Sequence, residues 1–301
     1  MVYENVTEII GNTPVVKIND RELKGQLFAK LEYLNPGGST KDRAALYMIQ
    51  GLIDRGVVNS NTVLVEPTSG NTGIGMAMVA AALNLKCKII MPDNMSVERI
   101  KMMKAYGAEV VLTPGREGMT GAIVKSKEFA NLPNHIVLFQ FCNPDNVLSH
   151  RMTTAQEIIK DFRTLDYVVA GIGTGGTLTG IAEVVKSKYK EIKVIGIEPE
   201  GSPVLTKGQK GEHKIQGIGP GFTPIILNLD LVDEVRTVSD DDAIEFARRL
   251  SVKHGVLAGF SGGAAYKIAY DIAKTAEVGQ KILFIVPDNG ERYFSTSLYE
   301  V

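Results

Sequence analysis

Cysteine is scarce in this 301-residue chain, tryptophan is absent, and the formal net charge is −1. The two cysteines, Cys87 and Cys142, are too few for a disulfide framework, and reduced thiols in the cytoplasm are the usual state of such residues. Neither has a second cysteine or a histidine at metal-ligand spacing, so no metal site is expected. We expect Cys87, in "KCKII", to be buried packing. The near-neutral charge provides no electrostatic basis for binding nucleic acid or an anionic membrane.

A long apolar run is also missing. The uncharged stretch 67–85 has Pro, Ser, Asn and Thr in its first third, whereas a spanning helix needs about 20 mostly apolar residues. The N-terminus lacks the basic and apolar regions of a secretory signal. These absences predict a soluble, cytoplasmic protein with no membrane partner. The length fits one large domain or two smaller ones.

Short β-branched runs recur along the chain and alternate with amphipathic stretches. Near-continuous apolar runs predict strands that are covered on both faces, at 62–66, 88–91, 109–113, 136–140, 167–171, 193–198 and 281–287. Helices are expected over 96–107 and over 241–255, where Ser239 and Gly255 provide start and stop signals. Strand and helix alternation at this spacing predicts an α/β fold with parallel sheets. The segment 143–147 is the best candidate boundary between two lobes, and 150–162 should be helical.

The segment "AGIGTGGTLTG" (170–180) follows a predicted strand, and Gly171, Gly173 and Gly176 satisfy the G-x-G-x-x-G pattern. Glycines allow backbone N–H groups to converge on an anion at a helix N-terminus. Glu198 follows Gly176 by twenty-two residues, where a dinucleotide site has an acid for the ribose. The segment alone therefore leaves three readings: a dinucleotide, another phosphorylated cofactor, or a tight packing turn.

A second segment, "EPTSGNTGIG" (66–75), also lies between a predicted strand and a predicted helix. Its hydroxyl and amide groups, on Thr68, Ser69, Asn71 and Thr72, suit a carboxylate at a helix N-terminus. The alternative is a helix cap with a flanking turn.

The third segment, "LNPGGSTKDRAAL" (34–46), contains Lys41 in a predicted first helical turn. Cations prefer the opposite end of a helix, so this position favours the free amine that forms a Schiff base. The alternative is a solvated lysine paired with Asp42. Together, a phosphate cradle, a carboxylate cradle and a reactive lysine are what pyridoxal phosphate with an amino-acid substrate requires. A nicotinamide oxidoreductase leaves Lys41 and the 68–72 loop unexplained.

Eight stretches, which occur in the same order along nearly the whole chain, resemble the cysteine synthase (O-acetylserine sulfhydrylase) family. These are pyridoxal-phosphate enzymes of fold type II, the tryptophan-synthase-β-like group. The stretches are 10–18, 29–45, 66–77, 139–146, 170–180, 215–222, 259–265 and 290–299. The resemblance implies two lobes, each a mostly parallel twisted sheet flanked by helices. It implies a smaller mobile substrate-side domain at 36–145, and a larger phosphate-binding domain of 1–35 with 146–301.

The resemblance also implies a role for each matching residue. Lys41 would hold the cofactor covalently and remove the substrate α-proton, Asn71 would bond the ring 3′-oxygen, and Ser261 would face the ring nitrogen. The phosphate would be bound by Gly173, Thr174, Gly175, Gly176 and Thr177. The substrate carboxylate would be bound by Thr68, Ser69, Gly70, Thr72 and Gln140.

The implied reaction is β-replacement, in which O-acetyl-L-serine and sulfide give L-cysteine and acetate. Closure of the smaller domain would exclude water. The family resemblance further implies a homodimer whose active site can receive the C-terminal peptide of serine acetyltransferase.

Departures from the family pattern keep other readings open. The "NPGGSTKDR" motif is shared with cystathionine-β-synthase-like enzymes, and Asp288 stands where many relatives have serine, which allows broader nucleophile use. A cysteine-using, hydrogen-sulfide-producing lyase and a cystathionine-forming enzyme are the alternatives within the fold, and a partner-binding protein without turnover is the non-enzymatic one. The donor could also be O-phosphoserine or serine. The four histidines are expected at the surface or at caps.

Overall fold

The structure is a computed structural model that describes residues 2–300, and its ordered elements alternate between strand and helix. The strands are β1 Val15–Ile18, β2 Gln26–Leu31, β3 Val63–Pro67, β4 Lys86–Pro92, β5 Glu109–Thr113, β6 His135–Val137, β7 Tyr167–Gly171, β8 Lys193–Pro199, β9 Glu234–Val238 and β10 Lys281–Val286. The α-helices are α1 Lys41–Asp54, α2 Asn71–Ala82, α3 Val97–Ala105, α4 Gly118–Ala130, α5 Pro144–Ser149, α6 Ala155–Asp161, α7 Gly176–Lys188, α8 Val204–Lys207, α9 Asp240–His254 and α10 Phe260–Thr275.

The chain folds into two compact units. Unit 1 comprises the N-terminal residues up to Ile10 together with Asn35–Ser149, and unit 2 comprises Gly11–Leu34 together with the chain from His150 onward. The first ten residues group with unit 1, because Val6 and Ile10 pack on the same core as α2. The change of unit falls after α5 rather than within 143–147, because α5 packs against α1.

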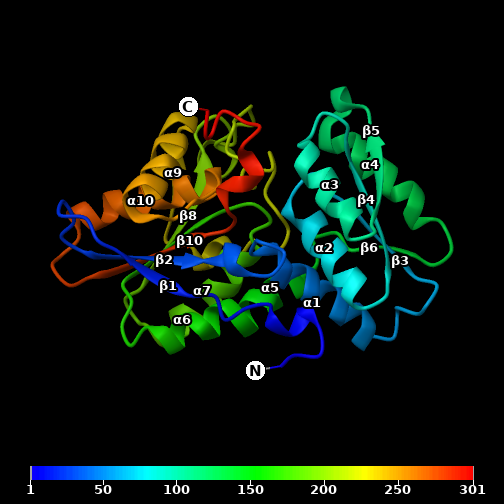
Figure 1. The fold of residues 1–301 in the computed structure, drawn as a ribbon. Helices are drawn as coiled ribbons and strands as arrows, with labels where there is room; N and C mark the ends of the chain where they lie inside the picture. The colour runs from blue at the N-terminus through cyan, green and yellow to red at the C-terminus, as the bar shows by residue number, and fades with distance from the viewer. Residues whose placement is uncertain (1, 301) are drawn as a thin grey trace. The chain divides into compact units, whose positions relative to one another are not determined.

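The sheet of unit 1 is parallel throughout, in the order β5-β4-β3-β6. Helices α1, α2 and α3 share a core with one face, which includes Leu64 and Ile89. Helix α4 covers the other face over Val65 and Ile90 (Figure 1). Since neighbouring residues of one strand contact opposite layers, both faces are buried and the strands read as continuous apolar runs.

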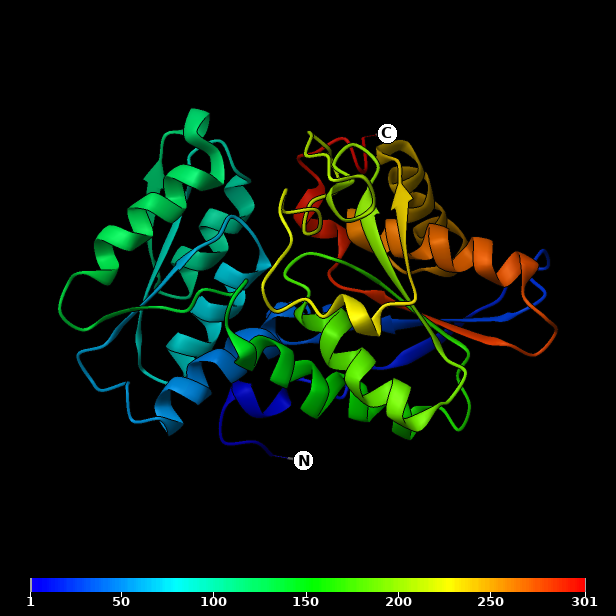
Figure 2. The same ribbon diagram turned by 180° about the vertical axis from the view of Figure 1, so that it is seen from behind.

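The sheet of unit 2 has the order β1-β2-β10-β7-β8-β9, in which only the β1–β2 pairing is antiparallel among the described strands. Helices α9 and α10 cover one face, and α6 and α7 cover the other (Figures 1 and 2). Strand β10 illustrates the alternation: Phe284 contacts the α9 and α10 layer, whereas Leu283 contacts the α6 and α7 layer. The fold class is therefore the predicted one, with two mostly parallel sheets flanked by helices.

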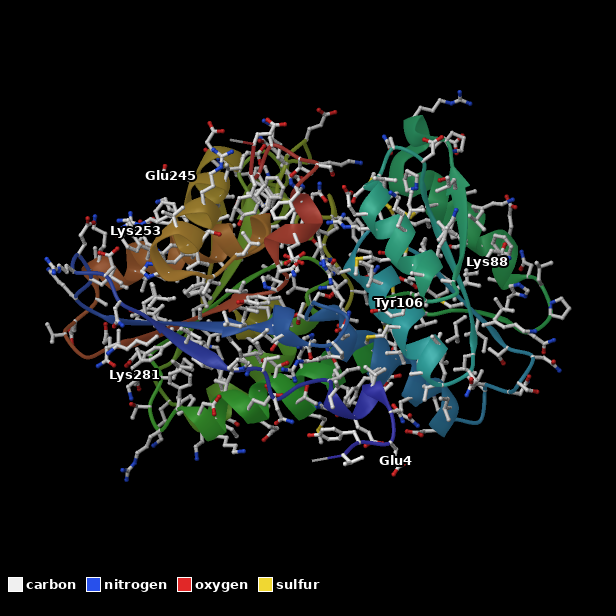
Figure 3. The ribbon with its side chains drawn as sticks, in the orientation of Figure 1. Glu4, Lys88, Tyr106, Glu245, Lys253 and Lys281 are labelled. Carbon is white, nitrogen blue, oxygen red and sulfur yellow. The ribbon has the colours of Figure 1, made fainter. Side chains whose placement is uncertain are left out.

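Helix α9 shows how the local sequence sets its bounds. The Ser239 side chain accepts a hydrogen bond from the Asp242 N–H, and Gly255 ends the helix in the left-handed conformation, with φ 68°. Phe246 on its inner face is buried, while Glu245 and Lys253 point outward (Figure 3). The predicted start and stop signals of this helix are confirmed.

Candidate functional site

The sheet of unit 1 reverses its strand order between β3 and β6. From β3 the chain proceeds through α2 to β4 and β5, and α4 then carries it back to β6 on the other side of β3. In open α/β sheets such a reversal leaves a crevice at the carboxyl ends of the two strands, where ligands bind. The segment 68–72 follows β3 and Gln140 follows β6. The Thr72 hydroxyl donates to Gln140 Oε1 at 2.6 Å, so the fold brings these predicted substrate residues together.

The N-terminus of α2 lies at the carboxyl end of β3, at this reversal point. Gly70 is its N-cap residue and has no side chain to cap the first-turn N–H groups, while Asn71 and Thr72 are the first two helical residues. The Thr68 hydroxyl accepts from the Gly70 N–H at 3.2 Å, which fixes the turn that enters the helix. Helix N-termini attract anions through their N–H groups and dipole. This end of α2 is therefore suited to a carboxylate.

Lys41 is the first residue of α1 and is half-buried. Helices α1 and α2 approach closely: a Cβ added at Gly75 would lie 3.0 Å from the Lys41 carbonyl oxygen. The lysine and the carboxylate cradle thus belong to adjacent helices of one unit. Asp42 is fully buried and accepts a hydrogen bond from the Gly37 N–H at 2.6 Å. The alternative of a solvated Lys41–Asp42 pair at the surface is therefore wrong.

Unit 2 has its own reversal point, between β7 and β10. The chain leaves β7 through α7 toward β8 and β9 on one side, and α10 returns it to β10 on the other. The predicted phosphate loop occupies the carboxyl end of β7. Gly175 adopts φ 85° as the N-cap of α7, and the Gly176 N–H donates to Thr174 Oγ1 at 3.3 Å. A loop of this kind at a helix N-terminus suits a phosphate group.

The 216–219 loop connects the phosphate loop with Ser261. A Cβ added at Gly173 would lie 2.4 Å from the Gly217 carbonyl oxygen, so only glycine permits this approach. A Cβ at Gly217 would in turn lie 3.8 Å from Ser261 Oγ. Ser261 is buried in the first turn of α10. Unit 2 therefore brings its predicted cofactor residues to one place.

Asp288 follows β10 and lies beside the start of α10. Its carbonyl accepts from the Gly259 N–H at 3.2 Å, and its carboxylate accepts from the Tyr293 hydroxyl. The side chain is buried, with 1% of its surface exposed. Asp288 thus belongs to the framework that holds Ser261.

Glu198 does not have the role that a dinucleotide site requires. Its buried carboxylate accepts from the Leu205 N–H at 2.8 Å, the Thr206 N–H at 2.9 Å and the Thr206 hydroxyl at 2.6 Å. The acid that could have met a ribose holds the start of α8 instead. The dinucleotide reading of the glycine loop is wrong for this reason.

Two residues that bond to predicted site residues were not identified from the sequence. His150 was expected at the surface or at a cap, but it is buried, and its ring nitrogens lie 2.9 Å from Thr154 Oγ1 and 3.1 Å from Thr177 Oγ1. It lies in a π-helical turn, His150–Thr154, a feature frequent at functional sites. Glu66 is a carboxylate buried at the end of an otherwise apolar strand. A charged residue within an apolar strand is the sequence signal that could have identified Glu66.

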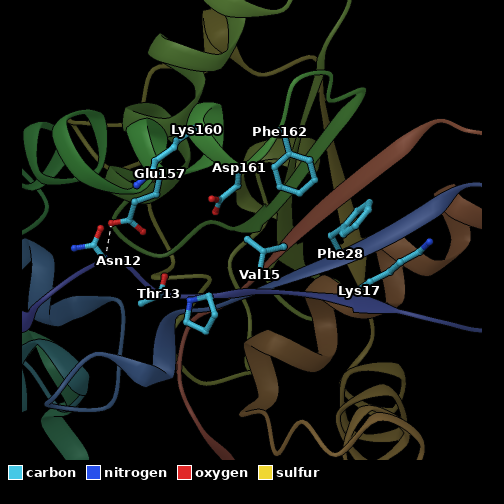
Figure 4. A pocket seen from close by; sticks show the side chains of 10 residues that line it. Asn12, Thr13, Val15, Lys17, Phe28, Glu157, Lys160, Asp161 and Phe162 are labelled. Carbon is cyan, nitrogen blue, oxygen red and sulfur yellow. Dashed lines mark hydrogen bonds between the residues drawn. The ribbon is translucent and has the colours of Figure 1, made fainter.

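A cavity of about 470 Å³ lies elsewhere in unit 2, between β1, β2 and α6 (Figure 4). Glu157 lines it, accepts from the Asn12 N–H at 2.8 Å and pairs with the buried Lys30 at 2.8 Å. None of the predicted site residues lines this cavity. It is therefore separate from the candidate site.

Residues 2–300 contain neither a candidate metal site nor a candidate membrane span. No group of three or more His, Cys, Asp or Glu side chains is placed to hold a metal ion. In the same part of the chain, every helix is too short or too polar to span a bilayer.

Comparison with known proteins gives the family. The family described as pyridoxal-phosphate dependent enzyme matches residues 6–288. The chain belongs to this family.

The most informative relatives within the family are similar over almost their full lengths. A cysteine synthase of Staphylococcus aureus strain N315 is 47% identical over 300 residues, covering 98% of this chain and 97% of the relative. The solved cysteine synthase of Entamoeba histolytica superposes with a TM-score of 0.97 at 41% identity, covering 100% of this chain and 92% of that one. A hydrogen sulfide-producing enzyme from Fusobacterium nucleatum superposes with a TM-score of 0.94 at 45% identity, covering 97% of this chain and 100% of that one.

The residues present fit the cofactor of this family. Pyridoxal phosphate needs an anion cradle, a partner for its ring nitrogen and an amine for its aldehyde. Unit 2 offers the first two through the α7 N-terminus, with its close Gly173 approach, and through Ser261. Unit 1 offers the third through Lys41.

Proposed function

We propose that this chain is a cysteine synthase that converts O-acetyl-L-serine and sulfide into L-cysteine and acetate with pyridoxal phosphate as cofactor. The observation that carries the proposal is the Thr72–Gln140 hydrogen bond at the α2 N-terminus, in the same unit as Lys41. It provides a carboxylate site beside a lysine, which an amino-acid enzyme of this family needs. The full-length similarity to cysteine synthases supports the choice of substrate.

In this proposal the residues of unit 1 handle the amino acid. The N–H groups of the uncapped α2 terminus receive the α-carboxylate, with the Thr68, Ser69, Gly70, Thr72 and Gln140 positions surrounding it. Lys41 Nζ would hold the cofactor and would then accept the α-proton of the substrate. Asn71, at the first position of α2, would hydrogen-bond the 3′-oxygen of the ring.

The residues of unit 2 hold the cofactor. The phosphate is bound by Gly173, Thr174, Gly175, Gly176 and Thr177 at the α7 N-terminus. When bound, pyridoxal phosphate supplies an electron sink that makes the α-proton of the amino acid acidic. The Ser261 hydroxyl, a neutral partner, would leave the ring nitrogen unprotonated, which would weaken this sink and favour elimination and replacement at the β-carbon.

We further propose how the protein is organised. Residues 36–145, which make up most of unit 1, are the mobile substrate-side domain, and unit 2 is the phosphate-binding domain, for which the sequence predicted 1–35 with 146–301. The protein acts as a cytoplasmic homodimer, which sedimentation at known concentration tests. The α2 N-terminus also suits the terminal carboxylate of a peptide, such as that of serine acetyltransferase, and titration with the free peptide against its C-terminally amidated form tests this.

The experiment that tests the reaction compares two assays on the same purified holoenzyme. L-Cysteine formation from O-acetyl-L-serine and sulfide should exceed cystathionine formation from cysteine and homocysteine by at least tenfold. Lys41→Ala should abolish both activities, whereas Lys104→Ala, at the exposed end of α3, should change neither. Faster turnover of cysteine than of O-acetylserine would contradict the proposal.

One observation favours a second candidate, release of hydrogen sulfide from cysteine. The Fusobacterium nucleatum relative, at 45% identity, is a hydrogen sulfide-producing enzyme, and Asp288 lies within the framework that holds Ser261. Sulfide released from L-cysteine alone, measured in the same preparation, separates this candidate from the first.

A further inference from the structure

Glu66 is a buried carboxylate that the proposed reaction does not use. It lies on β3, 1% exposed, two residues before Thr68. Its Oε2 accepts from the Phe139 N–H at 2.8 Å, and its Oε1 accepts from the Gln140 N–H at 3.2 Å. Both donors belong to the turn that follows β6. Glu66 therefore spans the two strands between which the strand order reverses.

The turn that Glu66 holds has an unfavourable backbone conformation. Phe139 has φ 55°, in the left-handed region that bulky residues rarely adopt, and its side chain is exposed. Hydrogen bonds to an ionised carboxylate are about twice as strong as those between neutral groups. Two such bonds offset the cost of the Phe139 conformation and bring Gln140 back toward the sheet.

The same carboxylate fixes the backbone from which the Gln140 side chain extends, through the Gln140 N–H. The other end of that side chain, Oε1, accepts from the Thr72 hydroxyl at 2.6 Å. The Gln140 carbonyl is fixed separately by the Asn146 side chain at 2.9 Å. An unbroken chain of bonds runs from Glu66 to the first turn of α2.

We propose that Glu66 is a positioning residue, whose ionised carboxylate sets Gln140 and Thr72 for binding of the substrate α-carboxylate at the α2 N-terminus. This inference rests on the proposed function of that site. Protonation of Glu66 removes one acceptor position, releases the 138–140 turn and weakens substrate binding without touching the reacting atoms.

The surroundings of Glu66 allow it to titrate near neutrality. Burial raises its pKa to about 7, against the lowering effect of its hydrogen bonds from Gln140 and Phe139. Across the sheet, Cys87 on β4 is neutral, since burial raises the pKa of its thiol to about 12. Two charged groups of neighbouring elements bond elsewhere: Lys88 of β4 to Glu109, and Arg99 of α3 to the Ser69 carbonyl.

Other titratable groups on elements that pack against β3 have partners of their own. His135 of β6 lies 2.9 Å from the Pro133 carbonyl. On α4, Lys125 bonds Glu128, on the sheet face opposite to Glu66. Residues 71–82 of α2 contain no titratable side chain.

Helix α1 shares the core on the Leu64 face of the sheet and carries Lys41, Asp42 and Arg43. These groups are present in both enzymes, so the Glu66 variant is compared with wild type as a ratio.

The test is the ratio of kcat/KM for O-acetyl-L-serine between wild type and Glu66→Gln, from pH 5.5 to 9. Glutamine mimics the protonated acid, so the ratio should lie within twofold of one below pH 6. It should rise to at least tenfold above pH 8, through KM rather than kcat. Titrations shared by both enzymes cancel in the ratio. A purely structural role gives a ratio independent of pH.

Controls separate folding, function and positioning. Glu109→Gln, the same change at an exposed site of the same sheet, should keep the ratio near one throughout. Should Glu66→Gln not fold, Glu66→Asp keeps the charge but shortens its reach, and its KM should rise at least threefold above pH 8 with cofactor content unchanged. A constant ratio, or a loss carried by kcat or cofactor content, overturns the inference. Wild type inactive on O-acetyl-L-serine instead overturns the proposed function, and the ratio is then measured with L-cysteine, which has the same α-carboxylate.

Discussion

Gly175 is the position at which one added methyl group should most directly disturb the proposed phosphate loop. Its φ is 85°, and a Cβ there would lie 2.7 Å from Leu227 Cβ and 3.0 Å from Leu227 Cα. Alanine in the left-handed region costs about 1–2 kcal/mol, and overpacking adds about 1–3 kcal/mol. Gly175→Ala should therefore lower the free energy of unfolding by about 2–5 kcal/mol, measured by urea denaturation of the cofactor-free protein.

The same change should weaken cofactor binding. Rotation of the 175–176 peptide to relieve the clash moves the Gly176 N–H at the start of α7. A hydrogen bond to a charged group is worth about 1.5–3 kcal/mol, so loss of one raises the dissociation constant of pyridoxal phosphate about 10- to 150-fold. Titration of the cofactor-free protein, followed by the visible absorbance of bound cofactor, measures this change.

Gly255→Ala is the matched control. Gly255 ends α9 with φ 68°, and a Cβ there would meet nothing within 4 Å. Gly255→Ala should lower the free energy of unfolding by only about 1–2 kcal/mol, which is what alanine costs in the left-handed region. It should leave cofactor affinity unchanged. Unaltered cofactor affinity in Gly175→Ala, or an equal loss in both variants, would refute the assignment of this loop to the phosphate.

Three further predictions concern unit 1. Lys41→Ala should purify without covalently attached cofactor, so that borohydride treatment followed by intact-mass measurement shows no added mass; a retained adduct at another lysine contradicts the proposal. Thr72→Val removes the donor to Gln140 Oε1, and an unsatisfied buried acceptor costs about 1–3 kcal/mol, so kcat/KM should fall about tenfold or more through KM, and a change in kcat alone would argue against it. Cys87 is buried with its thiol pKa raised to about 12, whereas Cys142 is exposed; a thiol reagent at pH 8 should label one cysteine per folded chain and two after unfolding, and rapid labelling of both would show that Cys87 is accessible.

Strands that contain continuous apolar runs could be predicted because this pattern is local. The buried strand β7 and the edge strand β5 both have the predicted bounds, 167–171 and 109–113. Strand β6 ends at Val137 instead of continuing to 140, because the turn at Phe139 bonds to Glu66 of another strand. Apolarity alone does not report that long-range contact.

Three strands were not predicted, and each lies at or near an edge of its sheet. Strand β1 is the outer strand beside β2, and β9 is the outer strand beside β8. Strand β9 is only partly buried, and its sequence "EVRTV" mixes charged and apolar residues, so it lacks a continuous apolar run.

The site residues likewise divide into those that local motifs predicted and those that depend on distant partners. Glycine, serine and threonine segments after strands locate ligand loops, because a parallel sheet places strand ends at one edge. His150 and Glu66 gave no comparable signal, since their partners Thr177 and Gln140 lie 27 and 74 residues away.

The amino-acid sequence by itself determined the α/β class, most strand positions, the family resemblance and the cofactor, because each depends on local apolar runs or on short glycine- and lysine-containing motifs. Only the tertiary structure decided that Glu198 anchors a helix, that His150 is buried, and that Glu66 holds Gln140. The physical reason is that a polar side chain takes its role from the donors and acceptors that the fold brings to it. Those partners come from strands and helices far away along the chain.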